Sequence, residues 1–380
     1  MMTASLSMSR RASDVPLSLP NLSELEIAYA AEALASGDIG PAGPFRDRFE
    51  AIWAARNGTA HAITVSSGTA ALHVALVALG IAPGDEVIVP ATTYVASANA
   101  VLHAGARPVL VDVDPETFCI DPAAAAAAVT ARTRAIMPVH LFGHPCPMDA
   151  LEEIAGARDI ALVADGAHAP LAGYRGNPVA AAATVTTHSF FQNKIFSCGE
   201  GGALLTNDAD LIVRATQVRA HGLDLGGRAI YHRLGYNYRL TNLACAILCA
   251  QEERADAILA RHAELNRLYR QLLADHPSIA LQAIRDWAEP VQWFFPLVLR
   301  NPAPALDRVI ARLGERGIGA RPFFPSLDSI PHLSAFHAER PHPLTTARRL
   351  ADRGLLLPLR ATMSDRDVER VVEELAVALR

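Results

Sequence analysis

Between residues 61 and 165 the sequence repeats one pattern, a short apolar run followed by a stretch with helical periodicity. Apolar runs at residues 61–66, 86–90, 107–112, 135–140 and 161–165 alternate with helical patterns at 69–82, 97–104, 121–131 and 148–157. Strands that alternate with helices are typical of a mostly parallel sheet that lies between helices. The pattern therefore predicts the α/β fold class.

The remainder of the chain predicts a smaller second domain. Helices are expected at 21–35 and 45–56, two closely spaced strands at 185–190 and 202–206 form a hairpin at the sheet edge, and a long helix covers 242–274. A strand at 291–299 and helices at 305–316 and 365–379 follow, which is an α+β pattern. A chain of 380 residues also exceeds one ordinary core. We predict a disordered tail (1–15), a large α/β domain (16–250), and a linking helix with a small α+β domain (251–380).

Composition excludes several classes of function. The formal net charge of −5 gives no long-range attraction to nucleic acid or to an anionic membrane. The five cysteines are scattered and include no CxxC pair, so neither a metal site nor a disulfide framework is expected. Residues 1–15 lack the apolar segment of a secretory signal, and the apolar stretch 69–82 is too short to span a bilayer. A cytoplasmic protein is expected.

Lys194 is the only lysine in the chain. All other basic side chains except the histidines are arginine, which cannot form a Schiff base at neutral pH, whereas a lysine with a lowered pKa can. A chance surface lysine is the alternative. The apolar run before Lys194 and the glycine-rich run Gly199–Gly202 after it favour a chemical role.

Two further positions lie where a strand ends. Ser66-Ser67-Gly68-Thr69 precedes a predicted helix, and the free N–H groups of a helix N-terminus bind anions such as phosphate. An ordinary helix cap explains these residues equally well. Asp165 ends an apolar strand, where a carboxylate can pair with a pyridinium nitrogen, and His168 follows it. A helix cap and a structural histidine are the alternatives.

The order of these motifs resembles a known family. Strand–SSGT–helix, Asp165-Gly-Ala-His168, Ser189-x4-Lys194 and Gly199-Glu-Gly-Gly202 are similar to the DegT-type sugar aminotransferases of pyridoxal-phosphate (PLP) fold type I, from about Leu17 to the C-terminus. Runs such as Gly84–Pro90, Pro138–Pro145 and Gly235–Arg239 resemble most the GDP-perosamine synthase group, which makes a 4-amino sugar from a nucleotide 4-keto sugar. That group usually carries glutamate at the position of His168, so the sugar itself stays open.

The resemblance implies a cofactor and a site. PLP would be bound covalently by Lys194, with Asp165 at its ring nitrogen, Tyr94 stacked on one ring face and His168 at the ring or its phenolic oxygen. Tyr94 and His168 have core packing as their alternative. The phosphate would be held by the turn and by a residue of the later strand 185–190: Ser67, Gly68, Thr69 and Ser189.

The resemblance also implies partners. Asn237 would reach the phosphate of a neighbouring subunit in a homodimer, and Arg239 and Arg321 would bind anions of the donor or the substrate; a turn residue and surface ion pairs are their alternatives. The implied reaction is a ping-pong transfer of an amino group from glutamate or glutamine to a nucleotide-linked keto sugar. A glutamine-dependent keto-cyclitol aminotransferase and a non-catalytic PLP-binding protein are the competing hypotheses.

Overall fold

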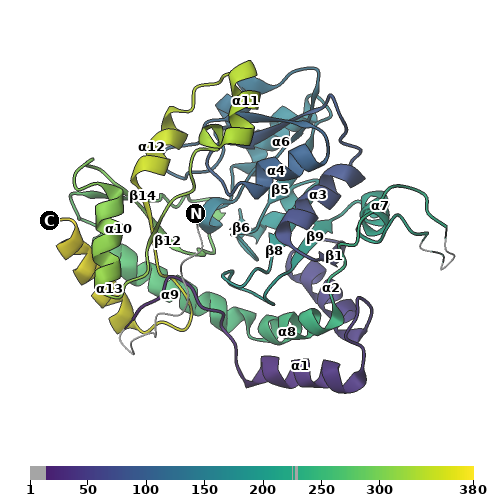
Figure 1. Ribbon diagram of the computed structural model, residues 1–380, viewed down its shortest axis with the longest axis horizontal. Helices are drawn as coiled ribbons and strands as arrows, with labels where there is room; N and C mark the ends of the chain where they lie inside the picture. Colours follow the sequence, from purple (N-terminus) through teal and green to yellow (C-terminus); the bar gives the residue numbers. More distant parts are fainter. Residues whose placement is uncertain (1–13, 225, 227–229) are drawn as a thin grey trace.

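The structure, a computed structural model, describes residues 14–224, 226 and 230–380. Its main part is a seven-stranded sheet with helices on both sides (Figure 1). The strands, in spatial order, are β1 (His61–Val65), β9 (Gly202–Thr206), β8 (Val185–Ser189), β5 (Ala161–Asp165), β4 (Thr133–Ile136), β2 (Glu86–Pro90) and β3 (Arg107–Val111). This arrangement confirms the predicted α/β class.

The sheet is parallel from β8 to β3, and only β9 runs against its neighbours. The predicted pairing of β8 with β9 is present, with Ser189 opposite Gly202. The prediction that this hairpin forms the sheet edge is wrong, because β1 pairs with the far side of β9 and is itself the edge. β1 comes first in the sequence, so it was grouped with the early βα units. Its pairing with the distant strand β9 leaves no local pattern in the sequence.

Successive side chains along a strand point alternately into two separate cores, as a sheet covered on both faces requires. Val87 and Val89 of β2 point to one core, whereas Ile88 points to the other. The first core includes side chains of α2 (Pro44–Arg56), α3 (Gly68–Ala78), α4 (Ala96–His103), α7 (Ala209–Arg219) and α8 (Asn242–Glu253). The second includes α5 (Pro122–Ala128), which is shorter than predicted, and α6 (Met148–Gly156).

The predicted long helix 242–274 is in fact two helices. α8 ends at Glu253 and α9 (Ala255–Leu273) begins after Arg254, whose ψ of 3° is not helical. The Arg254 guanidinium instead donates to the buried carboxylate of Glu26 in α1 (Glu24–Ser36) at 2.6 Å. The apolar periodicity continues across Arg254, so the sequence pattern did not reveal the break.

The C-terminal part has its own sheet and core. The antiparallel order is β10 (Ile279–Leu281), β12 (Phe295–Leu299), β14 (Gly354–Leu357) and β13 (Arg321–Pro322). α9, α10 (Leu306–Glu315) and α13 (Asp365–Ala378) pack on it. A third small sheet joins β6 (Gly173–Tyr174), β7 (Asn177–Pro178) and β11 (Ala288–Glu289).

Two features show that the two parts are interleaved. Val15 is buried and its N–H donates to the carbonyl of Gly317 at 2.8 Å, so the predicted tail stops short of Val15. The rest of that prediction, residues 1–13, lies outside the described residues. α11 (Pro331–Glu339) and α12 (Thr345–Arg353) contribute Leu333 and Leu350 to the core of the large sheet. The boundary at residue 251 stays a prediction.

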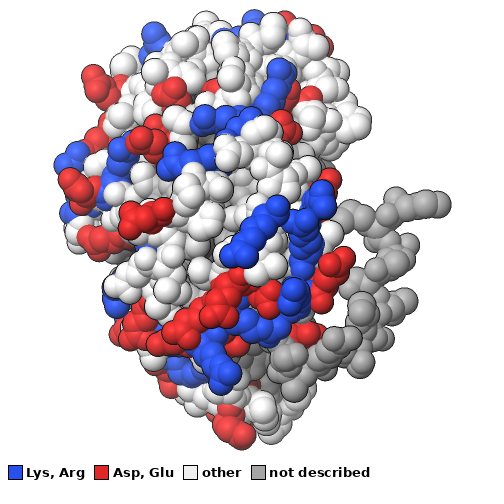
Figure 2. Space-filling view, turned by 90° about the vertical axis from the view of Figure 1, so that its left-hand side faces the viewer, with Lys and Arg blue, Asp and Glu red and all other residues white. Residues whose placement is uncertain are grey.

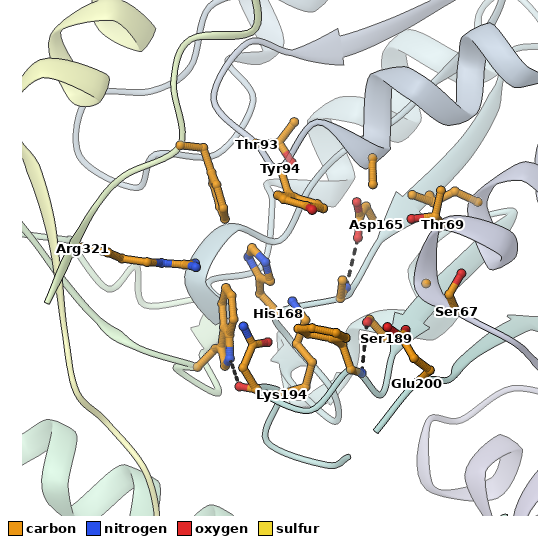
Figure 3. Close-up of a pocket in the computed structure, with 18 residues that line it drawn as sticks. Ser67, Thr69, Thr93, Tyr94, Asp165, His168, Ser189, Lys194, Glu200 and Arg321 are labelled. Atoms are coloured by element: carbon orange, nitrogen blue, oxygen red, sulfur yellow. Dashed lines mark hydrogen bonds between the residues drawn. The ribbon is translucent and has the colours of Figure 1, made fainter. Parts of the chain in front are cut away.

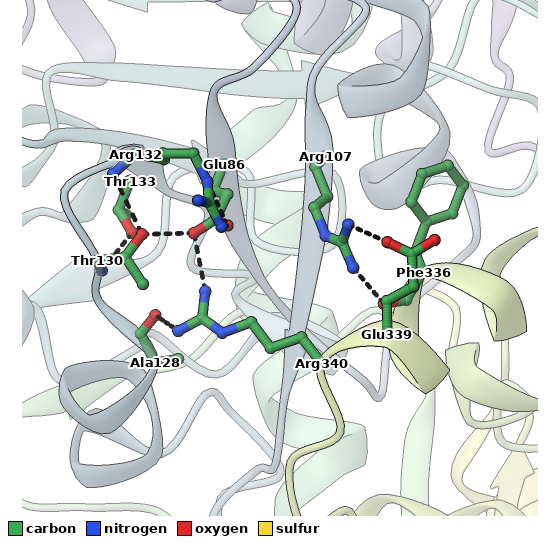
Figure 4. Close-up of polar contacts among 9 residues, drawn as sticks. All are labelled: Glu86, Arg107, Ala128, Thr130, Arg132, Thr133, Phe336, Glu339 and Arg340. Atoms are coloured by element: carbon green, nitrogen blue, oxygen red, sulfur yellow. Dashed lines mark hydrogen bonds and ion pairs between the residues drawn. The ribbon is translucent and has the colours of Figure 1, made fainter.

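A polar network fixes the end of α11 to the large sheet (Figure 4). The Glu86 carboxylate, which is fully buried at the start of β2, accepts from Thr130 Oγ1 at 2.6 Å and from Arg132 and Arg340 at 2.6 and 2.8 Å. Arg340 also donates to the carbonyl of Ala128 at 2.6 Å. A buried carboxylate with two cationic partners satisfies the condition for a stable buried ion pair.

The surface carries charges of both signs. Figure 2 shows acidic and basic side chains interspersed over one face of the molecule. Within residues 14–224, 226 and 230–380, no helix is long and apolar enough to cross a bilayer.

Candidate active site

A cavity of about 460 Å³ opens where β1, β5 and β8 end (Figure 3). Ligands of open α/β sheets bind at the carboxyl ends of the strands, and this volume suits a small molecule. The cavity brings together nine of the eleven predicted site residues: Ser67, Gly68, Thr69, Tyr94, Asp165, His168, Ser189, Lys194 and Arg321.

One end of the cavity is formed by the turn at residues 67–69, which has the features of an anion-binding turn. Ser67 caps α3 by accepting from Ala70 N–H at 3.1 Å, so the following residues form the first helical turn. The first N–H groups of a helix have no partner within it and carry the positive end of the helix dipole. A Cβ on Gly68 would lie 2.8 Å from Ser189 Cβ, so only glycine allows this close approach. The structure shows the helix cap, and the same turn leaves its free N–H groups facing the cavity.

Lys194 lies on a turn that follows β8, and its amine projects into the cavity. The Nζ atom lies 3.8 Å from the centre of the Trp293 ring. Burial lowers the pKa of Lys194 to about 7; the nearby Asp165 carboxylate opposes this and Arg321 adds to it. A large share of the amine is therefore unprotonated at neutral pH, as a nucleophile or a base requires.

Asp165 ends β5 as a buried carboxylate with two donors. Its Oδ2 accepts from Ser97 Oγ at 2.8 Å, and its Oδ1 accepts from the N–H of Ala167 at 3.1 Å. Burial raises the pKa of Asp165, while these two hydrogen bonds and Lys194 counteract the rise. A carboxylate has about four acceptor positions, so two remain for a ligand.

His168 is a neutral ring within an aromatic stack. Its Nδ1 accepts from the N–H of Phe142 at 3.3 Å, which leaves the proton on Nε2. The ring stacks on Trp293 with centroids 4.2 Å apart and an angle of 27°. Burial, with Lys194 and Arg321, holds its pKa well below the usual value. His168 thus has one structural hydrogen bond, at Nδ1, and also lines the site.

The other end of the cavity is formed by Arg321, which lies beside Phe324. In Figure 3 Arg321 enters from the side opposite Ser67 and Thr69. Its guanidinium lies 5.1 Å from the Trp293 ring centre and 5.3 Å from that of Phe324. Burial lowers its pKa to about 10, and its Nε and Nη2 have no hydrogen-bond partner within the described residues. A cation without a counterion in a cavity wall favours an anionic ligand.

Asn237 and Arg239 do not line the cavity. Asn237 is exposed, and its side-chain oxygen accepts from Arg239 Nη2 at 3.1 Å. Their loop nevertheless lies beside the anion-binding turn, because Ser66 N–H donates to the Tyr238 carbonyl at 2.7 Å. Within one chain these two side chains are therefore available to a neighbour rather than to their own cavity.

Sequence reasoning missed four residues that shape the site. Trp293 contacts Lys194 and His168, Phe324 packs beside Tyr94 with centroids 5.7 Å apart, and Thr93 and Ser97 support Asp165. The aromatic run at 293–295 and the hydroxyls flanking Tyr94 gave no spacing that distinguished them from core residues.

The residues present fit PLP. An anion-binding turn, a lysine amine with a lowered pKa and a buried carboxylate match its phosphate, its carbonyl carbon and its ring nitrogen respectively. In the described residues no group of histidine, cysteine and carboxylate side chains has the arrangement of a metal site. Fold and site together define a PLP-dependent enzyme of the aminotransferase fold.

Comparison with known proteins gives the family. The model of the DegT/DnrJ/EryC1/StrS aminotransferase family matches residues 20–376. GDP-perosamine synthase of Caulobacter vibrioides is 39% identical over 96% of this chain and 98% of its own, and that of Escherichia coli O157:H7 is 35% identical over 95% and 97%. The solved structure of S. venezuelae DesV in complex with a ketimine intermediate is 34% identical, covers 96% of this chain and 100% of its own, and has a TM-score of 0.88. The chain belongs to this family and is a PLP-dependent aminotransferase.

Proposed function

We propose that the enzyme transfers the amino group of glutamate to a nucleotide-linked keto sugar, a 4-keto-6-deoxy sugar of the kind that a perosamine synthase uses, by a ping-pong mechanism. The observation that carries the proposal is the 39% identity to a GDP-perosamine synthase over almost the whole of both chains. The cavity supports it, because Arg321 offers a cation at the end opposite the anion-binding turn.

Lys194 has two tasks in this proposal. Its amine would hold the cofactor through Nζ and, once released, would take up the α-proton of the amino donor at Nζ and later give it back. A pKa of about 7 suits both directions, since the amine gains and loses a proton with similar ease at neutral pH. When bound, PLP supplies the electron sink for the breaking C–H bond.

Asp165 and the aromatic side chains position the reaction. The Asp165 carboxylate would accept the N–H of the cofactor ring and stabilise its protonated form. Tyr94 and His168 lie where they would cover the ring, and the neutral state of His168 adds no second positive charge beside Lys194. Ser67, Gly68, Thr69 and Ser189 would hold the phosphate.

A homodimer would complete the site. Asn237 is exposed beside the anion-binding turn but outside its own cavity, which supports a role at the phosphate of a partner subunit. Arg239, which donates to Asn237, would reach the same region or an anion of the substrate. We place the enzyme in the cytoplasm, in keeping with its free cysteines.

Two experiments test the substrate. The enzyme is converted to its amino form with glutamate or glutamine and mixed with a panel of nucleotide keto sugars and inososes, and products are read by mass. The proposal expects an aminated nucleotide sugar. A thermal shift with GDP or dTDP, and none with inositols, also supports it. Amination of an inosose with glutamine would favour the keto-cyclitol alternative.

A further inference from the structure

The Asp165 carboxylate is held by a chain of two buried hydroxyls. Ser97 Oγ donates to Asp165 Oδ2 at 2.8 Å, and Thr93 Oγ1 lies 3.0 Å from Ser97 Oγ. Ser97 is fully buried and Thr93 nearly so. Thr93 also lines the cavity, directly before Tyr94.

The direction of the chain follows from counting protons. An ionised carboxylate only accepts hydrogen bonds, so the Ser97 hydroxyl must donate its one proton to Asp165. Ser97 Oγ can then only accept from Thr93, whose hydroxyl must donate. A donor that itself receives a hydrogen bond is polarised, which strengthens its bond to the carboxylate. When Asp165 is ionised, the chain therefore runs from Thr93 through Ser97 to the carboxylate, and each hydroxyl proton has an acceptor.

The same residue also anchors the backbone beside Tyr94. The N–H of Ser97 donates to the carbonyl of Tyr94 at 3.2 Å. Ser97 thus connects the side chain expected at the ring face with the carboxylate expected at the ring nitrogen. A helix-capping role does not explain its side chain, because its hydroxyl points to Asp165 rather than to an N–H of α4.

We propose that Ser97, supported by Thr93, is a positioning residue that fixes the orientation of Asp165 and keeps its carboxylate ionised. This inference rests on the proposed role of Asp165 at the cofactor nitrogen. It predicts that loss of either hydroxyl acts through Asp165, and that the two losses are not additive, because Thr93 reaches the carboxylate only through Ser97.

The test uses Ser97→Ala and Thr93→Val, alone and combined, in the wild-type enzyme and in Asp165→Asn. Thr92→Val is the matched control: Thr92 is buried beside Thr93, yet its hydroxyl has no partner in the described part of the chain. Single-turnover reaction with glutamate gives the rate and the half-saturating concentration, and the absorption spectrum reports the state of the bound cofactor. Urea unfolding of the cofactor-free proteins measures the same coupling without catalysis.

We expect Ser97→Ala to slow the half-reaction about 10- to 100-fold, as loss of a hydrogen bond to a charged group does. The half-saturating concentration should stay within about twofold, because the substrate is not touched. Thr93→Val should slow it less, and should add nothing in Ser97→Ala. In Asp165→Asn the effect of Ser97→Ala on rate, spectrum and urea midpoint should largely disappear.

Equal slowing by Ser97→Ala in both backgrounds would overturn the inference and leave Ser97 a packing residue. The inference would also be overturned if Ser97→Ala had the rate and spectrum of the wild type while Asp165→Asn was slow. A wild-type rate in Asp165→Asn would instead overturn the proposed function of Asp165 itself. If Ser97→Ala does not fold, the isosteric Thr93→Val decides: a rate and spectrum equal to those of Thr92→Val would overturn the inference.

Discussion

Lys194 shows how much one residue type can predict. As the sole lysine in the chain it was identifiable without any structure, because its replacement elsewhere by arginine implies a need for an amine that loses its proton. The lowered pKa and the cavity agree with that argument. Trp293, which lies against the same amine, could not be found this way, since nothing in the sequence separates it from a core aromatic.

The lowered pKa of Lys194 gives a pH-dependent prediction. The folded pKa of about 7 lies below the unfolded value of 10.5, so between these values the unfolded chain binds more protons and stability should rise with pH. Below pH 7 the cost of the buried cation is fully present. The difference in unfolding free energy between the cofactor-free wild type and Lys194→Met, measured in urea, should change from pH 7 to 10, with the wild type gaining stability relative to the variant. Parallel curves would contradict a lowered pKa.

The same lysine should carry the cofactor. Borohydride reduction of the holoenzyme followed by peptide mapping should place the pyridoxyl group on Lys194. A reduced holoenzyme with the group elsewhere would refute the assignment.

Arg321 should show a conflict between stability and function. Arg321→Met removes a half-buried cation that has no counterion among the residues that the structure describes, so the cofactor-free protein should be as stable as the wild type or more stable. The same change should raise the half-saturating concentration of one substrate by about 10- to 100-fold, the loss of one charged hydrogen bond. Measuring both half-reactions separately assigns the residue, because only the step whose anion it binds should change. Arg316→Gln, a surface variant, is the control.

At the scale of elements, the turn before α3 sets how close a ligand can approach. Gly68→Ala would bring a Cβ to within 2.8 Å of Ser189 Cβ, so the turn or β8 must shift. We expect about 10- to 100-fold weaker PLP binding, in line with the cost of overpacking, measured by equilibrium dialysis. Gly156→Ala, at the end of α6, is the control for loss of a glycine, since a Cβ there meets nothing within 4 Å and its φ is not positive. Equal PLP affinity in Gly68→Ala and the wild type would remove the turn from the site.

The elements themselves were predictable where their pattern is local. The βα units from residue 61 to 165 follow from periodicity, and so does the pairing of β8 with β9. Three features depend on distant contacts: the edge position of β1, the break at Arg254, and the packing of α11 and α12 on the large sheet. Burial against a distant part of the chain produces no periodic pattern in the sequence. The sequence therefore did not predict these three features.

At the scale of the whole molecule, the site is expected to require two copies of the chain. If Asn237 reaches the phosphate of a partner, Asn237→Ala should weaken PLP binding by up to about tenfold, the value of one neutral hydrogen bond, without lowering the unfolding temperature of the cofactor-free protein. Dilution that separates the subunits should release PLP in parallel, which sedimentation and cofactor fluorescence follow together. A monomer with full PLP occupancy would refute the shared site.

The interleaving of the two parts limits how this enzyme could exchange pieces with its relatives. Val15 and the segment after it pair with residues 317–319, while α11 and α12 return to the large sheet, where Arg340 meets Glu86. A crossover at residue 251 would therefore separate partners on both sides of the join. Chimeras should fold only when Val15 comes from the same parent as residues 317–319 and α11–α12 come from the same parent as the large sheet.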